Sequence, residues 1–486
     1  MKRIVSLLLV ICLTALSLAA CSEKNAADET AEKGSQIAAP SDPSAADPAD
    51  DGEDSGKSDY FNGLEARDFD GWTLNLANDG LNPEYFSRFI VDELTGDEFN
   101  DGLFNRQIAV QDKYNVSIAE TYSGSVNSIK NCVTAGSGDV GFGQVLAYNC
   151  MQLILQKYVL AFTDLPVIDM TRPYWDQGAQ KDLTFFGKMY YGYCDIGFDL
   201  YEGLAVMFYN GYLLTDNGIA DSPFDLYMEG KWTLDAMYGM MTSVARDLNG
   251  DGQMNVRNDL FGWSGREFEY LPSLYSSGLR LISYDEAAET YTMDITQEGV
   301  MAVGDKLNKI INDTNLSVIG RNDETRNLFK AGGCLFYSRL LGDFRLLRDK
   351  EDDYGIICYP SLEENTVQEV YVQNPFAIMV PSDCPDTERL GTLIEALAAY
   401  TYDNILDVYI NRAVIGKGAR DEESALLLRK VITLRAFDLC YAFDTFAPVE
   451  AYGLGVKNGN YASAQQRQEK VFNKTVAKVV SALRGE

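Results

Sequence analysis

Hydrophobic and polar residues follow regular periods along the chain beyond residue 58. Residues 72–78 alternate apolar and polar side chains, which is typical of a half-buried strand. Residues 99–114 carry apolar side chains at helical spacing, and residues 115–118 then predict a second strand. This order of strand, helix and strand indicates the start of an α/β domain.

The same periods continue towards the C-terminus. A strand and a helix are predicted within residues 139–158, and Thr233 is the predicted N-cap of a helix that ends near residue 246. Residues 354–360 are interpreted as a crossing of the chain between two lobes. Further strands are predicted at 261–266, 289–295, 334–337 and 376–380, and further helices at 296–312, 388–402, 404–410, 422–439 and 464–483.

Residues 171–210 are rich in aromatic side chains, and glycines at positions 187, 192, 197 and 203 interrupt them. The glycines argue against one long helix, so the stretch predicts short strands and turns that line a cleft and cross between two lobes. Trp and Tyr present a flat apolar face with a polar tip, which suits a ligand such as a sugar. The alternative is that these rings fill a core.

The N-terminus has the pattern of a secretory signal peptide. Lys2 and Arg3 precede an apolar run at residues 4–16, and small residues then lead to Cys21, which predicts a signal peptide at residues 1–20. Cysteine at this position resembles the lipobox of bacterial lipoproteins. The resemblance implies that Cys21 carries a diacylglyceryl group, further acylated where the organism does so, and anchors the protein at the outer face of the cell membrane. The alternative is an ordinary signal peptide followed by a chance cysteine.

The segment from 21 to 58 consists mostly of Ala, Ser, Asp, Glu, Pro and Gly and contains no aromatic residue. Such a composition cannot bury enough apolar surface to offset the entropy of ordering, so it predicts a disordered acidic tether. The remaining residues, 59–486, are enough for two or three domains of about 150 residues each. With 46% hydrophobic and 12% aromatic residues, the chain can build a substantial core.

Charge and residue types exclude several classes of function. The formal net charge of −31 argues against binding to nucleic acid and to anionic membrane surfaces, so the lipid anchor is the only membrane contact predicted. The chain has no histidine, which excludes Ser-His-Asp and Cys-His nucleophile pairs, HExxH metal sites and a histidine general base. No CxxC pair is present, and buried thiols are predicted rather than a zinc site or a disulfide framework.

The most specific local motif begins directly after the helix that ends near residue 246. It follows the calcium-loop pattern D-x-[DN]-x-[DN]-G, in which oxygen atoms converge on one point and Gly252 permits the sharp turn. The twelfth position, where a carboxylate is expected, holds Asn258. The predicted ligands of a structural calcium ion are Asp247, Asn249, Asp251, the carbonyl oxygen of Gln253, and Asp259. The alternative is an Asx-rich turn that needs no metal.

Short motifs along almost the whole mature chain carry a resemblance to a known family. They are the lipobox at Cys21, LTGDEFND at 94–101, NR at 105–106, YNV at 114–116, LPVID at 165–169, PYWD at 173–176, GK at 187–188, FYN at 208–210, GKWT at 230–233, the loop at 247–252, FG at 261–262, YG at 354–355 and RDEES at 420–424. In this order they resemble the extracellular solute-binding lipoproteins of bacterial ABC importers, the family that includes maltose-binding proteins, and most of all a Gram-positive branch.

The resemblance implies an α/β, two-lobed, periplasmic-binding-protein-like (type II) fold with a ligand cleft between the lobes, and no enzymatic activity. The expected first lobe comprises residues 59–195 and 298–352, and the second comprises residues 196–297 and 353–486. The family further implies a monomer that closes on a sugar or sugar-like solute and delivers it to ABC permease subunits. Lobe closure shifts a pre-existing equilibrium, because the ligand contacts both lobes only in the closed state.

The family motifs do not identify the ligand contacts, which are predicted from aromatic and amide residues near strand ends and crossings. The two tryptophans are the best candidates for stacking against a ring of the ligand. The candidate contacts are Asn78, Trp175, Tyr191, Asp195, Trp263, Tyr337 and Asn374. No catalytic residue is predicted.

Two other functions stay open at this point. A secreted, lipid-anchored glycoside hydrolase would also be acidic and lined with aromatic residues, and it needs only two carboxylates about 5 to 9 Å apart. A solute-binding protein could also serve a sensor kinase instead of a permease. The sequence does not identify the ligand, since a peptide or a polyol would use the same surfaces as a mono- or oligosaccharide.

Overall fold

The computed structural model describes residues 59–79, 89–266, 270–415 and 422–485, which all belong to one compact unit, Lys57–Glu486. The predicted signal peptide, Cys21 and the predicted tether lie outside the described residues. No helix within the described ranges combines the length and the apolar character needed to cross a bilayer.

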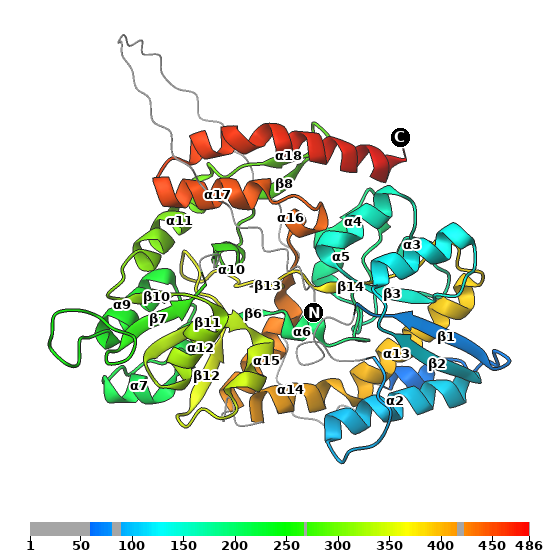
Figure 1. Ribbon diagram of the computed structural model, residues 1–486, viewed down its shortest axis with the longest axis horizontal. Helices are drawn as coiled ribbons and strands as arrows, with labels where there is room; N and C mark the ends of the chain where they lie inside the picture. The colour runs from blue at the N-terminus through cyan, green and yellow to red at the C-terminus, as the bar shows by residue number, and fades with distance from the viewer. Residues whose placement is uncertain (1–58, 80–88, 267–269, 416–421, 486) are drawn as a thin grey trace, which may run out of the picture. The chain divides into compact units, whose positions relative to one another are not determined.

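The first main sheet has the strand order β14-β3-β1-β2. Its central strand β1 (Trp72–Ala77) pairs in parallel with β2 (Val116–Thr121) and β3 (Phe142–Leu146), and β14 (Phe376–Met379) pairs antiparallel with β3. The helices that accompany it are α1 (Tyr60–Gly63), α2 (Glu98–Tyr114), α3 (Ser125–Ala135), α4 (Ala147–Leu155) and α13 (Thr387–Asn404). The strands and helices predicted within residues 72–158 and at 376–402 are thus confirmed (Figure 1).

The second main sheet has the strand order β10-β7-β11-β6-β12. Strands β7 (Phe261–Gly265), β10 (Ser317–Ile319) and β11 (Cys334–Leu340) run parallel, whereas β6 (Ala205–Asn210) is antiparallel to β11 and to β12 (Tyr354–Ile357). Its helical elements are α7 (Gly211–Asp216), α8 (Pro223–Met228), α9 (Leu234–Val244), α12 (Asn322–Lys330), η2 (Leu341–Leu347) and α15 (Glu422–Val431). Thr233 caps α9 as predicted, because its side chain accepts a hydrogen bond from the Ala236 N–H.

The strand pairing corrects the expected lobe boundaries. Residues 298–352 were expected in the first lobe, but they contribute β10 and β11 to the second sheet. Residues 353–486 were expected wholly in the second lobe, but β14 lies in the first sheet. Residues 354–360, interpreted as a crossing, include strand β12 of the second sheet. Hydrophobic periodicity identifies a strand without identifying its partner, which explains why the elements were found and their assignment was wrong.

The chain passes between the two sheets through short segments. The first includes α6 (Asp199–Glu202), the second follows β13 (Val370–Tyr371), and the third joins α13 to α14 (Leu406–Ile415). Isolated bridges pair Leu204 with Val372 and Gly192 with Ile378, so the first two passages lie next to each other. The central stretch between 171 and 210 also holds α5 (Gln177–Leu183) and the hairpin of β4 (Thr184–Phe185) and β5 (Lys188–Met189). The short helix η1 (Phe162–Asp164) precedes this stretch.

The remaining elements lie in the chain between β7 and β10 and after α15. They are α10 (Tyr270–Ser276), the hairpin of β8 (Ile282–Asp285) and β9 (Thr290–Met293), α11 (Glu298–Ile311), η3 (Ile432–Leu434), β15 (Arg435–Ala436), α16 (Leu439–Ala442), α17 (Ala447–Asn458) and α18 (Tyr461–Arg484). The helix predicted at 422–439 is therefore too long, because the chain leaves the helix after α15 and β15 pairs with β13. The predicted terminal helix is confirmed as α18.

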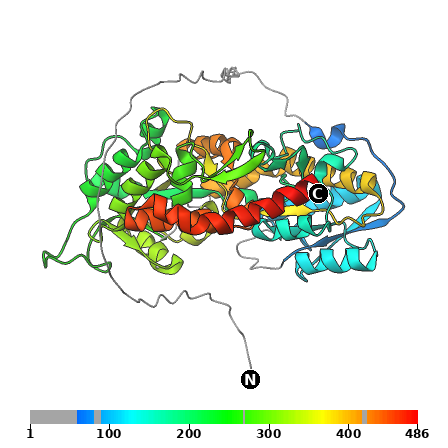
Figure 2. The same ribbon diagram turned by 90° about the horizontal axis from the view of Figure 1, so that it is seen from above.

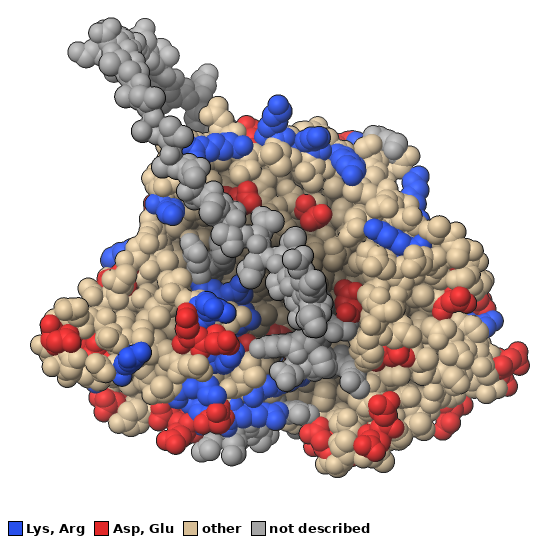
Figure 3. Space-filling model, viewed as in Figure 1, with Lys and Arg blue, Asp and Glu red and all other residues tan. Residues whose placement is uncertain are grey.

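Helices α17 and α18 pack against each other on the outside of the molecule (Figures 1 and 2). α18 also contacts β9 and α4. In the view of Figure 3, a row of Lys and Arg side chains follows the rim formed by α18, whereas lower on the same face Lys and Arg side chains lie among acidic ones.

Candidate ligand-binding site

The structure places both predicted stacking residues in the core. Trp175 is 1% exposed, and its indole N–H donates a hydrogen bond of 2.8 Å to Glu395. Trp263 in β7 is 2% exposed, and its indole N–H donates to the Ser338 hydroxyl at 2.6 Å. In the described conformation neither ring offers a face to a ligand, because both faces are packed against protein.

The two predicted tyrosines are also buried. The Tyr191 hydroxyl donates to the Ala442 carbonyl oxygen at 2.7 Å, and the ring stacks on Tyr193. The Tyr337 hydroxyl donates to Asp343 at 2.7 Å, and its ring packs against those of Phe208 and Phe329, which also contact each other. Because each hydroxyl already has an internal acceptor, the burial of these rings costs no unmatched hydrogen bond.

The predicted polar contacts lie at strand ends and crossings, as expected from their positions. Asn78 directly follows β1, and its amide donates to Glu120 at 2.7 Å. Asn374 lies in the passage before β14 and accepts a hydrogen bond of 3.4 Å from the N–H of Tyr148 in the first turn of α4. Asp195 is 3% exposed and accepts a hydrogen bond of 2.6 Å from Tyr201. Each of the seven predicted contacts forms a hydrogen bond with another residue of the described chain, and their role in binding stays a prediction.

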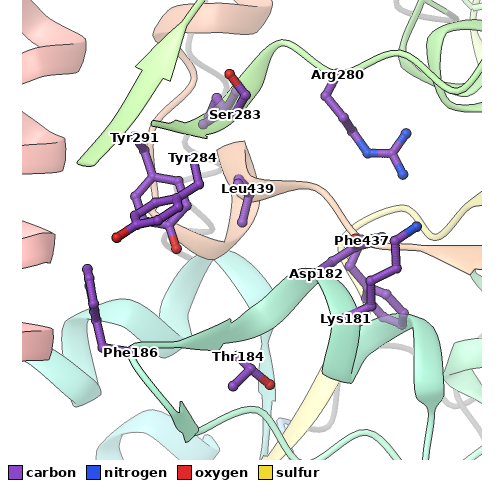
Figure 4. A pocket seen from close by; sticks show the side chains of 11 residues that line it. Lys181, Asp182, Thr184, Phe186, Arg280, Ser283, Tyr284, Tyr291, Phe437 and Leu439 are labelled. Carbon is purple, nitrogen blue, oxygen red and sulfur yellow. Dashed lines mark hydrogen bonds between the residues drawn. The ribbon is translucent and has the colours of Figure 1, made fainter. Parts of the chain in front are cut away.

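A pocket of about 400 Å³ lies where three segments that are distant in sequence meet (Figure 4). This volume lies in the range of small-molecule sites. The pocket takes side chains from α5 and the β4–β5 turn, from the β8–β9 hairpin and the residues before it, and from the start of α16. The lining residues are Lys181, Asp182, Thr184, Phe186, Arg280, Ile282, Ser283, Tyr284, Tyr291, Phe437 and Leu439.

One side of the pocket is aromatic. The ring centroids of Tyr284 and Tyr291 are 5.0 Å apart, and those of Phe186 and Tyr284 are 6.2 Å apart. Tyr284 is 43% exposed, so part of its ring is accessible. Burial raises the pKa of Tyr291 to about 12, so its hydroxyl stays protonated to a higher pH than that of an exposed tyrosine. This side therefore offers apolar ring surface with hydroxyl groups at its edge.

The other side of the pocket is charged. Glu369 lies behind it between Arg280, with which it forms an ion pair, and Lys181, whose Nζ is 2.7 Å from a Glu369 oxygen. Burial opposes ionisation of Glu369, but the two cations outweigh burial and lower its pKa. The Arg280 guanidinium also lies 3.9 Å from the ring centroid of Tyr275. The pocket thus combines firmly held donors with aromatic surface, which suits a hydroxylated ligand.

Local structure fixes the aromatic edge of the pocket. Phe186 and Gly187 form the turn between β4 and β5, with positive φ values of 50° and 77°. Two consecutive positive φ angles are typical of a type I′ hairpin turn, in which glycine is favoured and phenylalanine is strained. The turn holds the Phe186 ring at the edge of the pocket, beside Tyr284 (Figure 4).

The segment that carries Phe437 and Leu439 is held by hydrogen bonds on both sides. The Phe437 N–H donates to Asp182 at 2.9 Å, and burial raises the pKa of this carboxyl group. Asp438 caps α16 by accepting from the Cys440 N–H, and it also accepts the Tyr275 hydroxyl at 2.7 Å. None of the lining residues was among the predicted ligand contacts, because no local pattern links residues near 181, 284 and 437. Four of them, Lys181, Asp182, Thr184 and Phe186, do lie in the stretch 171–210 that was predicted to line a cleft.

The predicted calcium loop forms an Asx-rich turn. The two carboxylate oxygens of Asp247 accept hydrogen bonds of 2.7 Å from the N–H groups of Gly250 and Gly252. These donors lower the pKa of Asp247, the Gly252 N–H most of all. The Asp259 carboxylate is 3% exposed and accepts from the N–H groups of Leu248 and Asn255. Across the described residues, no three His, Cys, Asp or Glu side chains are grouped to hold a metal ion.

The predicted state of the cysteines is confirmed for the described part of the chain. All seven cysteines between residues 132 and 440 are free thiols, and only Cys384 is partly exposed.

No protein-family model matches the chain, and no curated protein matches its sequence. Solved structures do match its fold. The GacH receptor of Streptomyces glaucescens, solved without ligand and with acarbose, is 14% identical with a TM-score of 0.51 over 84% of this chain and 99% of its own. A cyclo/maltodextrin-binding protein in complex with maltotetraose is 11% identical, with a TM-score of 0.53 over 85% and 96%. UgpB from Mycobacterium tuberculosis in complex with glycerophosphocholine is 12% identical, with a TM-score of 0.53 over 77% and 96%.

The described α/β architecture is therefore that of a two-lobed solute-binding protein. More narrowly, the chain has the fold of the maltose-binding type, which confirms the fold class predicted from the sequence. At identities of 11 to 14%, this likeness establishes the fold, whereas function has to be argued from the site.

Proposed function

We propose that this protein is an extracellular, lipid-anchored solute-binding protein that captures a carbohydrate and delivers it to the permease of an ABC importer. The observation that supports this most directly is the pocket, which combines the partly exposed ring of Tyr284 with the paired cations Arg280 and Lys181 on a solute-binding fold. Similar structures bind acarbose and maltotetraose, and another binds glycerophosphocholine. A small polyhydroxylated solute is therefore consistent both with the fold and with the pocket.

A glycoside hydrolase fits this pocket less well. Such enzymes need two carboxyl groups that flank the scissile bond. Among the described residues that line the pocket, Asp182 is the single one with a carboxyl group, and it already accepts the Phe437 N–H. We therefore propose a binding protein and not an enzyme.

The proposed location rests on the N-terminal sequence. A leader followed by Cys21 predicts processing and lipid attachment, with the folded unit held outside the cell. Detergent phase partitioning of the cell-expressed protein and of a Cys21→Ala variant tests this. We expect only the wild-type protein to enter the detergent phase, and equal partitioning of both would contradict the anchor.

The ligand is identified by a thermal-shift screen of residues 59–486 against monosaccharides, oligosaccharides, polyols, peptides and glycerophosphocholine. A ligand at about a hundred times its Kd adds roughly 2.7 kcal/mol to the free energy of unfolding and raises Tm. A hit with a saccharide supports the proposal. No shift across the panel, or turnover of a saccharide in the same wells, contradicts it.

The pocket is then tested by calorimetry with the ligand that the screen identifies. Tyr284→Ala removes a partly exposed ring, and we expect the affinity to fall about tenfold, since a stacking contact is worth about 0.5–1.5 kcal/mol beyond its buried area. The matched control is Tyr212→Ala, because Tyr212 is 59% exposed on α7, outside the pocket. An affinity unchanged by Tyr284→Ala would place the ligand elsewhere.

A further inference from the structure

Helix α18 has two opposite faces. Its inner face buries Phe472, Val476 and Val479 and packs against α17, β9 and α4. On the outer face, Arg467, Lys470, Lys474 and Lys478 follow one another at intervals of three or four residues. At 100° per residue these four side chains fall within about 80° of the helix circumference and span about 17 Å of its length. We call these four residues the basic stripe.

The basic stripe has no internal partner. All four of its residues are exposed, and none forms an ion pair or a hydrogen bond with another residue of the described chain. Arg484 in the last turn of the same helix differs, because it pairs with Glu289 at 3.1 Å. Glu469 is the one acidic residue of α18, and helical geometry places it well away from the stripe.

The stripe also stands out from the rest of the surface. The chain has a net charge of −31, yet Lys and Arg side chains form a row over α18 in Figure 3. Val471, an apolar residue that is 55% exposed, lies beside the cations on the same face. An acidic protein is soluble without a row of unpaired cations on one helix face. The pattern therefore indicates a surface that binds a negatively charged partner.

We propose that the basic stripe of α18 docks the folded unit on an anionic lipid surface. The stripe is a convex helix face with mobile lysine ammonium groups, which suits the diffuse charge of lipid headgroups better than one fixed carboxylate or phosphate. An exposed valine among the lysines can also enter the headgroup region.

Two further observations favour a bilayer as the partner. The proposed lipid at Cys21 would keep the folded unit within a chain length of the bilayer, at most on the order of 130 Å when fully extended. The net charge of −31 argues against membrane binding by the molecule as a whole, and the stripe is a local exception. Repulsion between the anionic lipid and the acidic remainder of the protein surface would orient the molecule with α18 towards the bilayer.

The proposal is tested with the mature chain from Ser22, which lacks the lipid-bearing cysteine, by sedimentation with vesicles. One set contains phosphatidylcholine alone, and the other contains about one third phosphatidylglycerol. We expect binding only to the anionic vesicles, with an affinity that falls at least tenfold, by a rough estimate, between about 50 and 500 mM NaCl. We expect the Lys470→Glu/Lys474→Glu variant to bind at least about tenfold more weakly than the wild type at low salt.

The matched control is the variant Arg321→Glu/Lys430→Glu, which makes the same change in net charge at exposed positions outside α17 and α18. It should bind the anionic vesicles nearly as well as the wild type, and circular dichroism confirms that all variants are folded. Equal loss in both variants, or binding to neutral vesicles, would overturn the proposal. Binding to soluble poly-glutamate without binding to vesicles would also overturn it and assign the stripe to an acidic protein.

Discussion

Asp199 is a buried carboxyl group at the first passage of the chain between the two sheets. It accepts hydrogen bonds from the Gln144 side chain in β3, at 3.2 Å, and from the Phe376 N–H in β14, at 3.0 Å. Burial raises its pKa to about 7, even though these two donors favour the ionised form. One side chain at the start of α6 thereby holds two strands of the first sheet.

The Asp199→Asn variant tests this pKa through the pH dependence of stability. An unfolded Asp titrates near pH 4, so between about pH 4 and pH 7 the folded state keeps a proton that the unfolded state releases. The contribution of Asp199 to stability therefore falls as the pH rises through this window, by at most about 1.4 kcal/mol per pH unit. We expect the variant to gain stability relative to the wild type between pH 4 and pH 7, measured by urea unfolding.

Burial also raises the pKa of Asp195 to about 7, so Asp195 adds to the pH dependence of stability. Because Asp195 is present in both proteins, the difference between the variant and the wild type reports Asp199. Asp221→Asn is the control, since Asp221 is exposed. It reports the effect of an Asp-to-Asn substitution at an exposed site. A constant difference between Asp199→Asn and the wild type would show that Asp199 is ionised throughout.

Trp263 offers a second test at the residue scale. Its ring lies against Gly265, where an added Cβ would approach the ring to 2.4 Å, and its indole N–H donates to Ser338. We expect Trp263→Ala to lower the free energy of unfolding by about 3–5 kcal/mol, because it opens a large cavity. If Trp263 were instead a stacking surface for the ligand, the same substitution would abolish binding and leave urea unfolding almost unchanged.

At the scale of elements, the loop from Asp247 to Asp259 connects α9 to β7 and has the sequence of a calcium site. Its carboxylates are engaged by backbone N–H groups, which stabilises the turn without metal. Each carboxylate oxygen has a second lone pair, so these hydrogen bonds do not prevent coordination of a hard cation. We propose that calcium binds here with a structural role.

Calorimetry and thermal unfolding of the chelated protein, with and without calcium, test this site. We expect heat on titration and a higher Tm with calcium for the wild type, and neither for Asp247→Ala. If the loop is only an Asx-rich turn, Asp247→Ala lowers Tm by the same amount in chelator and in calcium, and the wild type shows no heat.

At the scale of the whole molecule, the larger hydrophobic core joins residues from both main sheets. It includes Val145 of β3 in the first sheet, and Phe208 of β6 and Phe336 of β11 in the second. A smaller core around β1 and α13 includes Trp175, whereas Trp232 and Trp263 belong to the larger core. Because the larger core is shared, the two lobes should unfold together.

We therefore expect one urea transition for residues 59–486, with coincident midpoints by tryptophan fluorescence and far-UV circular dichroism. The Trp72→Phe/Trp175→Phe variant leaves Trp232 and Trp263 as reporters of the second sheet. Its fluorescence midpoint should coincide with its own dichroism midpoint. A dichroism curve with two transitions, only one of which is seen by fluorescence, would show that the lobes unfold independently.

The sequence by itself determined most of the secondary structure and the classes of chemistry that are excluded. β1, α2, β7 and α18 were predicted nearly at their observed bounds, because hydrophobic periodicity and caps such as Thr233 are local properties. The absence of histidine excluded several kinds of catalytic site without any structure. The resemblance carried by short motifs predicted the two-lobed fold.

Only the tertiary structure decided which elements pair and which side chains are accessible. An alternating pattern shows that one face of a strand is buried but not against which partner, so β11 and β14 were assigned to the wrong lobes. Trp263 and Tyr284 are both aromatic residues near strands, yet the first is 2% exposed and the second 43% exposed. The pocket joins segments around residues 181, 284 and 437, and only long-range packing brings them together.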